Sequence, residues 1–568
     1  MQPGNGSGSG TETTTPGTGE TMQPGNGSGS GTGTTTPDNS EAKNQLESVI
    51  SDEMQKLAMY DDYSMIKSTL ANAYTTAKTV SKKADATKDE LINAKTTLET
   101  AIAKAATDKA EFDKKNKDLV EAYINLKATI KEKNNKLDSL SEMKYSGIKN
   151  HLISKYESAE TIIEKTLQAT PAININDVNK ANEDIISSIA KIDSEHQKEN
   201  ADEYNNFKLF NINKDNYKPA TVPENMQPRD YSFVAFSSNI ASANYKIANR
   251  VIKTVDKDNN LSNYKDITKV SWIYSLSGDN VSYEIDFSYY GPSSAMLYFP
   301  YKLANSEDNQ ISLKYKLNDN ATENIDFGEK MPELGSINVA KISLNNLNFG
   351  SNKLIFTTEQ NKKAPMIGNF YLSSNPESEN IIYNNIFGNN LSENKKSITV
   401  NFAKGYGLAN LPATIVKELN GKLENDSNNK KYYLIGFLGN HAAGTMENDS
   451  RNIKYFTFYV NAPEKGTYNI SGIYNSGDQQ GRGLTFWKNS YNNSKQGEFA
   501  KFNDLKTNDW NSLKTFNSEH PTTGMPNSLM LDKGLNKIIV SGYEPSKDAP
   551  NLGDVTFTLK EDNMNSVA

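Results

Sequence analysis

The chain of 568 residues contains no cysteine, only four histidines and only three tryptophans. The absence of cysteine excludes disulfide bonds, thiolate metal ligands and a cysteine nucleophile. The scarcity of histidine argues against a histidine-rich metal cage. Long apolar runs are also missing, since no stretch approaches the roughly 18 residues that span a bilayer. Binding chemistry therefore falls mainly to carboxylates, amides and aromatic rings.

Charge of one sign is not concentrated anywhere along the chain. The formal net charge is −7 and the basic residues form no block, whereas nucleic-acid binding needs clustered Lys and Arg. Nucleophile elbows, Walker loops and His-Glu-x-x-His motifs are also missing. We therefore predict a protein that is not an enzyme and has no nucleic-acid partner.

The residues that are present indicate several domains. The mean hydropathy is −0.69, and Tyr (29) outnumbers Phe (21), which is typical of a polar protein whose rings can contact water. A chain of this length exceeds one hydrophobic core. Residues 1–40 repeat the segment "MQPGNGSGSG" and lack the apolar residues needed to offset the entropy of ordering. We expect a disordered Gly/Ser/Thr/Pro tether there.

Two helical repeats follow, over residues 41–120 and 121–205. "YSMIKSTLANAYTTAK" at Tyr63 aligns with "YSGIKNHLISKYESAE" at Tyr145, with apolar residues at helical spacing. The tyrosines at that spacing are expected to pack in the cores. Thr87 followed by Glu90 predicts a capping box that opens a helix. "ATKDELINAKTTLETAI" resembles the FIVAR repeats of bacterial surface proteins, which implies a spacer or a partner-binding surface.

Beyond residue 228 the apolar period changes to two, with turns rich in Asn, Gly and Ser. Segments of this region are duplicated: Tyr283 and Gly368 have counterparts at Tyr468 and Gly553, each 185 residues later. The pattern predicts two related β-sandwiches, over residues 228–378 and 395–563. The expected fold class is multidomain α + β, with a disordered tail, helical repeats and two jelly-roll sandwiches.

The second sandwich resembles jelly-roll carbohydrate-binding modules of the galactose-binding-like type. The resemblance lies in "YFTFYVNAPEKGTYNISGIYNSG", "LDKGLNKIIVSG" and "NLGDVTFTL", in that order. Such modules bind sugars with stacked aromatic rings and an Asn before the last strand, and an Asp that follows often holds a structural calcium. The resemblance implies a metal residue at Asp554 and possible Ca2+ binding. It implies glycan-binding residues at Asn551, Tyr474, Trp487, Trp510 and Tyr543.

Each of these residues also has a purely structural interpretation. Trp487 ends the apolar run "GLTFW" and could belong to the core, whereas Trp510 has polar neighbours that favour exposure. Asn551 could cap a turn and Asp554 could begin a strand. In the first sandwich Met366 stands in place of Asn551 and Asn369 in place of Asp554. We expect that copy to lack this site, and a site between the two sandwiches remains an alternative because pockets favour domain boundaries.

Taken whole, the chain resembles the phase-variable lipoprotein haemagglutinins of mycoplasmas, the Mycoplasma gallisepticum-type surface haemagglutinin family. The segments that resemble this family are the repeated "MQPGNGSGSG", "MYDDYSMIKSTLANAYTTAKTVS", "GRGLTFW" and "GLNKIIVSG". The resemblance implies an adhesin on the extracellular face of the cell membrane that binds sialylated glycoconjugates of host erythrocytes and epithelia. It also implies recognition by antibodies, antigenic variation, a role in virulence, and a lipid anchor upstream of this cysteine-free chain. The alternative is an immune-evasion coat protein, or a binder of host proteins, without a sugar site.

Overall fold

The computed structural model describes residues 39–219, 231–240, 245–255, 261–265, 269–278, 280–424, 426, 428–439, 453–477, 481–491, 498–518, 526–542 and 548–561. The chain divides into two compact units. Unit 1 is residues 1–121 with 165–173, and unit 2 is residues 122–164 with 174–568. Nearly all of the predicted tether lies outside the described residues. No helix in the described ranges is long and apolar enough to cross a membrane.

Unit 1 is helical, as the apolar spacing predicted. Its core contains Leu46, Leu70, Tyr74 and Leu98, each at most 1% exposed. At the start of the longest helix the Thr87 hydroxyl accepts a hydrogen bond from the Glu90 N–H, and the Glu90 carboxylate accepts one from the Thr87 N–H. This confirms the capping box. The helices are α1 (Ser40–Ser51), α2 (Glu53–Ala58), α3 (Ser64–Lys82) and α4 (Lys88–Lys115).

Unit 2 begins with the second helical repeat. The tyrosines behave as predicted, since Tyr145 and Tyr156 are as buried in this unit as Tyr63 and Tyr74 are in unit 1. The helices that contribute are α5 (Lys117–Lys131) from Ala122 onward, α6 (Lys133–Asp138), α7 (Ser146–Glu164), α8 (Ile175–Ser194), α9 (Gln197–Asn206) and, after the first sandwich, α10 (Glu379–Ile386).

The two repeats leave matching hydroxyls without partners. The Tyr74 and Tyr156 hydroxyls are buried and have no hydrogen-bond partner among the described residues. An unsatisfied buried polar group costs roughly 1–3 kcal/mol. We therefore expect Tyr74→Phe and Tyr156→Phe each to raise the free energy of unfolding by about 1 kcal/mol, measured by urea denaturation.

The matched control is Tyr63→Phe. The Tyr63 hydroxyl donates to Asp113 Oδ1 at 2.6 Å, so its removal is expected to destabilise the protein. If Tyr74→Phe lowered stability as Tyr63→Phe does, an unseen partner of the Tyr74 hydroxyl would be indicated.

The first sandwich packs two sheets over a core that includes Leu297, Phe299, Phe356 and Phe370. One sheet has the order β1-β14-β8-β13-β6-β3, with β11 paired to β8. Its strands are β1 (Lys208–Phe210), β3 (Ile247–Asn249), β6 (Ser271–Ile273), β8 (Ser294–Lys302), β11 (Asn338–Asn345), β13 (Met366–Ile367) and β14 (Phe370–Ser373). The strands of the facing sheet are, in order, β10 (Glu323–Asn324), β9 (Lys314–Leu317), β12 (Gly350–Thr357), β7 (Ser282–Tyr289) and β2 (Tyr217–Lys218).

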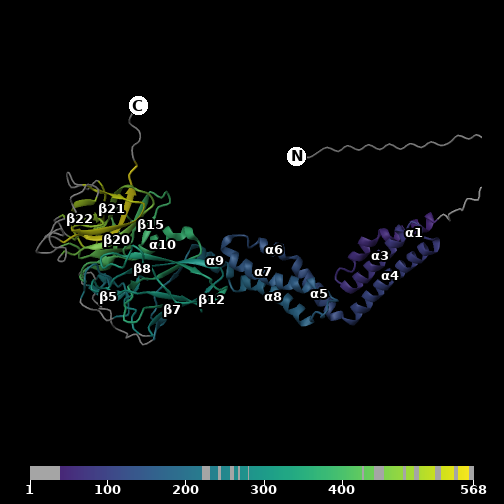
Figure 1. Ribbon diagram of the computed structural model, residues 1–568. Helices are drawn as coiled ribbons and strands as arrows, with labels where there is room; N and C mark the ends of the chain where they lie inside the picture. The colour runs from purple at the N-terminus through teal and green to yellow at the C-terminus, as the bar shows by residue number, and fades with distance from the viewer. Residues whose placement is uncertain are drawn as a thin grey trace, which may run out of the picture. The chain divides into compact units, whose positions relative to one another are not determined.

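The second sandwich has the same two-layer plan (Figure 1). Its larger sheet has the order β15-β16-β27-β19-β18-β24-β21-β25. Those strands are β15 (Asn389–Leu391), β16 (Ser397–Val400), β18 (Ile415–Leu423), β19 (Lys430–Gly436), β21 (Gly466–Asn475), β24 (Ser512–Phe516), β25 (Ser528–Leu531) and β27 (Asn551–Leu559). The facing sheet is β17 (Leu408–Ala409), β20 (Phe456–Ala462), β26 (Gly534–Gly542), β22 (Arg482–Lys488) and β23 (Phe499–Leu505).

Segments from the range predicted for the first sandwich contribute to the second sandwich. β4 (Ile252–Val255) lies in the range predicted for the first sandwich, yet it pairs in parallel with β18 of the second and antiparallel with β5 (Leu261–Lys265). Phe233 and Phe236, from the same range, pack in the second core. A fragment limited to residues 395–563 would therefore expose part of its core. Functional tests belong on the full chain.

A bulge orients the start of β27. Leu552, Val555 and Phe557 all belong to the second core, although the first two are three residues apart. The register between β21 and β27 shifts between Gly472 and Tyr474, which places an extra residue on β27 and lets the strand change its inward face. Ile367, Phe370 and Leu372 repeat the pattern in the first core. The duplication thus extends to the bulge.

Candidate functional site

Asn551 begins β27 as half of a buried amide pair. It is 7% exposed, and its Nδ2 donates to Asn475 Oδ1, at the end of β21, at 3.0 Å. Asn475 Nδ2 in turn donates to the Ser512 carbonyl at 2.7 Å. A Cβ on Gly436, at the end of β19, would lie 3.1 Å from Asn551 Oδ1. These contacts hold the pair rigidly where β19, β21 and β27 meet.

Trp510 lies just before β24, two residues from Ser512, whose carbonyl accepts the hydrogen bond from Asn475. Its ring packs on Gly477, where φ is +60° and an added Cβ would lie 2.0 Å from a ring atom, so glycine is required there. The ring is half-buried and keeps contact with solvent. The Arg482 guanidinium carbon lies 5.7 Å from the ring centroid. The polar neighbours of Trp510 favoured exposure, and the structure shows a half-buried ring.

Lys417, on β18, supplies a second cation to the same ring. Its Nζ lies 5.5 Å from the Trp510 centroid. The side chain is only 6% exposed, and burial lowers the pKa of Lys417 to about 8. Its ammonium has neither a hydrogen bond nor an ion pair with any of the residues that the structure describes. A buried cation without a counter-charge is costly unless an anion joins it.

Phe437 adds an exposed aromatic ring that the sequence did not single out. It follows Gly436, is 46% exposed, and has φ of 60°. A bulky residue in the left-handed region is strained, and such strain clusters at functional sites. The only sequence signal is its position between glycines in "YLIGFLGN". The Lys454 Nζ lies 5.9 Å from the centroid of the Phe437 ring, and the neighbouring Gly436 lies against Asn551. We call Asn475, Asn551, Trp510, Lys417 and, through Gly436, Phe437 the Trp510 cluster.

The remaining predicted site residues lie elsewhere. Tyr474 is 3% exposed in the second core, and its hydroxyl donates to the Lys506 carbonyl at 3.3 Å. Trp487, also 3% exposed, packs with Ile453 and Ile539. As placed, neither ring offers a face to a sugar. Tyr474 falls on an inward position of β21, whereas Trp487 lies on the face of β22 opposite Leu484 and Phe486, where a separate apolar cluster buries it. Tyr543 lies outside the described residues.

Asp554 lies away from the Trp510 cluster. It accepts a hydrogen bond from Asn401 Nδ2 at 3.4 Å, and burial raises its pKa to about 6. Calcium takes six to eight oxygen ligands, yet no group of three or more potential acidic, His or Cys ligands occurs in the described part of the chain. The nearby Lys404 ammonium, which acts electrostatically on Asp554, would also repel a divalent cation. The surroundings of Asp554 do not fit a calcium site.

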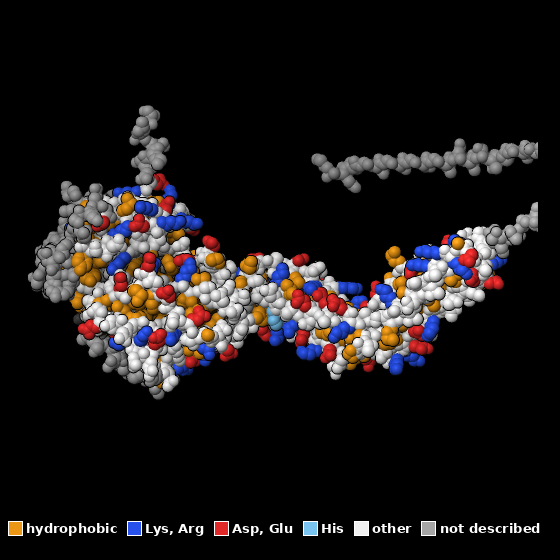
Figure 2. Space-filling view, viewed as in Figure 1, with side chains coloured by type: hydrophobic (Ala, Val, Ile, Leu, Met, Phe, Trp, Pro, Cys, Tyr) orange, Lys and Arg blue, Asp and Glu red, His pale blue; other side chains and the backbone are white. Residues whose placement is uncertain are grey.

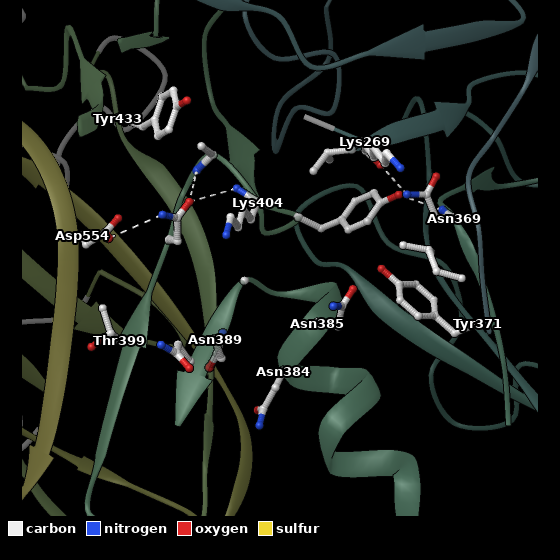
Figure 3. A pocket seen from close by; sticks show the side chains of 17 residues that line it. Lys269, Asn369, Tyr371, Asn384, Asn385, Asn389, Thr399, Lys404, Tyr433 and Asp554 are labelled. Atoms are coloured by element: carbon white, nitrogen blue, oxygen red, sulfur yellow. Dashed lines mark hydrogen bonds between the residues drawn. The ribbon is translucent and has the colours of Figure 1, made fainter. Parts of the chain in front are cut away.

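In place of a metal site, Asp554 lines a cavity of about 670 Å³ between the two sandwiches of unit 2 (Figure 3). Asn369, its counterpart in the duplication, lines the same cavity. Met366, the counterpart of Asn551, is instead 1% exposed in an apolar cluster. The two copies therefore use these positions differently: Asn551 supports a surface cluster, whereas Met366 is core.

Solved structures similar to the chain include carbohydrate-binding modules. A family 35 module from Clostridium thermocellum is 19% identical, covers 22% of this chain and 78% of its own, and has a TM-score of 0.17. A module from Cellvibrio mixtus lichenase 5A, in complex with cellotriose, is 14% identical over 26% of this chain and 88% of its own, with a TM-score of 0.17. No curated protein sequence matches the chain.

The fold defines a class of protein in which helical modules precede paired jelly-roll-like sandwiches. The FIVAR domain model matches residues 42–106 and 122–193, in the helical part. The Mycoplasma haemagglutinin model matches residues 207–334 and 328–560, which is most of the chain. The chain belongs to the Mycoplasma haemagglutinin family.

Proposed function

We propose that the protein is a non-enzymatic surface adhesin that binds sialylated glycans of host cells through the Trp510 cluster. The observation that carries the proposal is Lys417, a buried cation that has no hydrogen bond and no counter-charge among the described residues and is held against a solvent-accessible Trp ring. The carboxylate of an acidic sugar would supply the missing counter-charge. The C–H face of the sugar would lie on Trp510, which offers a large apolar area.

The other members of the cluster have supporting roles in this proposal. Phe437 offers a second aromatic surface beside Gly436. The Asn551–Asn475 pair fixes the strand ends that carry both rings, because its bonds reach Ser512 on β24. In this family context we further propose a lipid-anchored, phase-variable surface antigen that meets erythrocyte and epithelial glycoconjugates and antibodies. The helical modules would serve as a spacer.

The charge distribution agrees with a specific rather than a diffuse interaction. On the face that Figure 2 shows, Lys and Arg side chains are interspersed with Asp and Glu. A mixed surface gives no broad attraction to polyanions. Recognition of an acidic sugar would then depend on local cations such as Lys417.

The test uses the immobilised full chain with 3′-sialyllactose and with lactose. We expect Trp510→Ala to weaken 3′-sialyllactose binding by about 30-fold or more, because an aromatic anchor contributes roughly 2 kcal/mol. Lys417→Met is expected to remove the preference for the sialylated sugar. Met530→Ala, which alters an exposed apolar side chain on β25, should change nothing.

Three results would contradict the proposal. Sialoglycan binding that survives both Trp510→Ala and Lys417→Met would place the site elsewhere. Absence of any glycan binding, together with binding of a host protein, would favour the coat-protein alternative. Turnover of a sialoglycan would overturn the non-enzymatic assignment.

A further inference from the structure

The cavity between the sandwiches has the size and the construction of a ligand site. Its volume of about 670 Å³ falls in the range of roughly 300–1,000 Å³ typical of small-molecule pockets. Walls come from the first sandwich, from α10 and the turn that follows it, and from the second sandwich (Figure 3). Since all of these lie in unit 2, the cavity is formed within one compact unit.

Internal hydrogen bonds fix three amides of the wall. Asn369 Nδ2 donates to the Lys269 carbonyl, and its Oδ1 accepts from the Ile212 N–H. Asn389 Nδ2 donates to the Phe387 and Tyr459 carbonyls, both at 2.9 Å. Asn401 Oδ1 accepts from the backbone N–H groups of Ala403 and Lys404, both at 3.1 Å. The wall is therefore organised before any ligand arrives, which limits the entropy lost on binding.

Other polar groups of the wall make at most one hydrogen bond to the described residues. The Tyr371 side chain is 2% exposed, and Figure 3 shows its hydroxyl pointing into the space beside Asn385. That hydroxyl, like the side-chain amide of Asn385, has no hydrogen-bond partner in the described ranges. Asp554 has Asn401 as its only described partner, at 3.4 Å. The Tyr371 side chain is buried, Asp554 is half-buried and Asn385 is exposed. All three line the cavity, so they retain the capacity to hydrogen-bond to a ligand placed there.

The chemistry of these groups selects among ligands. An apolar ligand would leave the Tyr371 hydroxyl and the Asp554 carboxylate unpaired. An anion would be repelled by the Asp554 carboxylate, whose one opposing charge is Lys404. The other lysine of the lining, Lys269, comes from the first sandwich and is exposed. Hydroxyl groups match all three, because they can donate to the carboxylate and both donate to and accept from the amide and the phenol.

We propose that the inter-sandwich cavity is a second binding site, distinct from the Trp510 cluster, and that it takes a neutral, polyhydroxylated ligand such as a short saccharide. The Asp554 carboxylate accepts hydrogen bonds from ligand hydroxyls, and Tyr371 and Asn385 complete the contacts. Asp554 and its duplicated counterpart Asn369 contribute one wall each. The protein would thus hold two sites of different charge preference.

The test titrates the full chain with a panel of neutral mono-, di- and trisaccharides and with 3′-sialyllactose, using calorimetry and thermal unfolding. We expect at least one neutral saccharide to bind and to raise the unfolding temperature of unit 2, because it binds only the folded state. Tyr371→Phe removes an oxygen that bonds nothing else, so the fold is retained while affinity falls about three- to tenfold. Asp554→Asn is expected to weaken binding by tenfold or more, and Asn320→Ala, an exposed amide in the β9–β10 turn, to leave it unchanged.

Variants also separate this proposal from the proposed function. Trp510→Ala should weaken sialoglycan binding and leave neutral saccharide binding intact. Tyr371→Phe should weaken neutral saccharide binding and leave sialoglycan binding intact. The inference is overturned if no saccharide of the neutral panel binds at millimolar concentration. It is equally overturned if neutral binding is lost in Trp510→Ala, or is unchanged in both Tyr371→Phe and Asp554→Asn.

Discussion

Arg250→Ala is expected to lower the free energy of unfolding of unit 2 by roughly 3–5 kcal/mol. Arg250 lies between β3 of the first sandwich and β4, which pairs with the second, and is 3% exposed. Its Nη1 donates to the Phe402 carbonyl at 2.7 Å and to the Gly405 carbonyl. The guanidinium also lies 5.1 Å from the Phe233 ring centroid. Truncation removes both bonds and leaves a void.

The same loss should alter the cavity. Residues 401–406 contribute several of its lining residues, and Arg250 is bonded to two carbonyls of that loop. Burial lowers the pKa of Arg250 to about 10, so the side chain remains charged at pH 7. The Arg250 Nε has no partner among the described atoms. The hydrogen bonds to the Phe402 and Gly405 carbonyls and the contact with the Phe233 ring are therefore what offsets the cost of burying the guanidinium charge.

Urea denaturation measures the free energy of unfolding, and hydrogen exchange of peptides from 245–255 and 398–410 measures the local opening of the loop. Lys404→Ala changes an exposed side chain on the same loop and should shift stability by less than about 0.5 kcal/mol. Arg250→Met keeps most of the volume and isolates the hydrogen bonds. If the peptides of Arg250→Ala exchanged hydrogen at the rate of the native chain, the arginine would not hold the loop.

Asp554→Asn is expected to stabilise unit 2 at pH 7.5 by roughly 2–3 kcal/mol, after allowance for the partial exposure of the carboxyl. Burial raises the pKa of Asp554 from 3.8 to about 6, against the opposing effects of Asn401 and Lys404. Between pH 4 and pH 6 the folded state therefore binds more protons than the unfolded state. By linkage, the free energy of unfolding contributed by Asp554 falls as pH rises through this window.

An amide at position 554 carries no charge and can still accept from Asn401. The stability difference between Asp554→Asn and the native chain should therefore be largest above pH 6 and close to zero at pH 4. Asp532 provides a control of opposite sign, because the Lys488 hydrogen bond lowers the pKa of its carboxyl. Asp532→Asn should lose stability above pH 4. A pH-independent effect of Asp554→Asn would refute the assignment.

This stabilisation has a functional counterpart. A carboxylate retained at a net cost in stability is typical of functional sites. Asp554→Asn is expected to make the protein more stable and, at the same time, weaker in binding the neutral ligand. The two outcomes together would distinguish a binding role for Asp554 from a structural one.

The sequence by itself determined the features that depend on local pattern. Helical spacing placed Tyr63, Tyr74, Tyr145 and Tyr156 in cores, because residues three and four apart share one face of a helix. The Thr87 capping box was readable because its two hydrogen bonds join residues three apart. The duplication of the sandwiches was also visible, and the family followed from segments spread along the chain.

Only the tertiary structure decided which residues meet. The bulge in β27 directs Leu552 and Val555 to one core although they are three residues apart, and a strand pattern of period two cannot anticipate such a change. Lys417 lies on β18 and Trp510 just before β24, so their contact depends on sheet order. The exchange of β4 between sandwiches likewise follows from long-range pairing. Asp554 and Asn369 line one cavity because the two sandwiches pack together, a contact that no local stretch of sequence encodes.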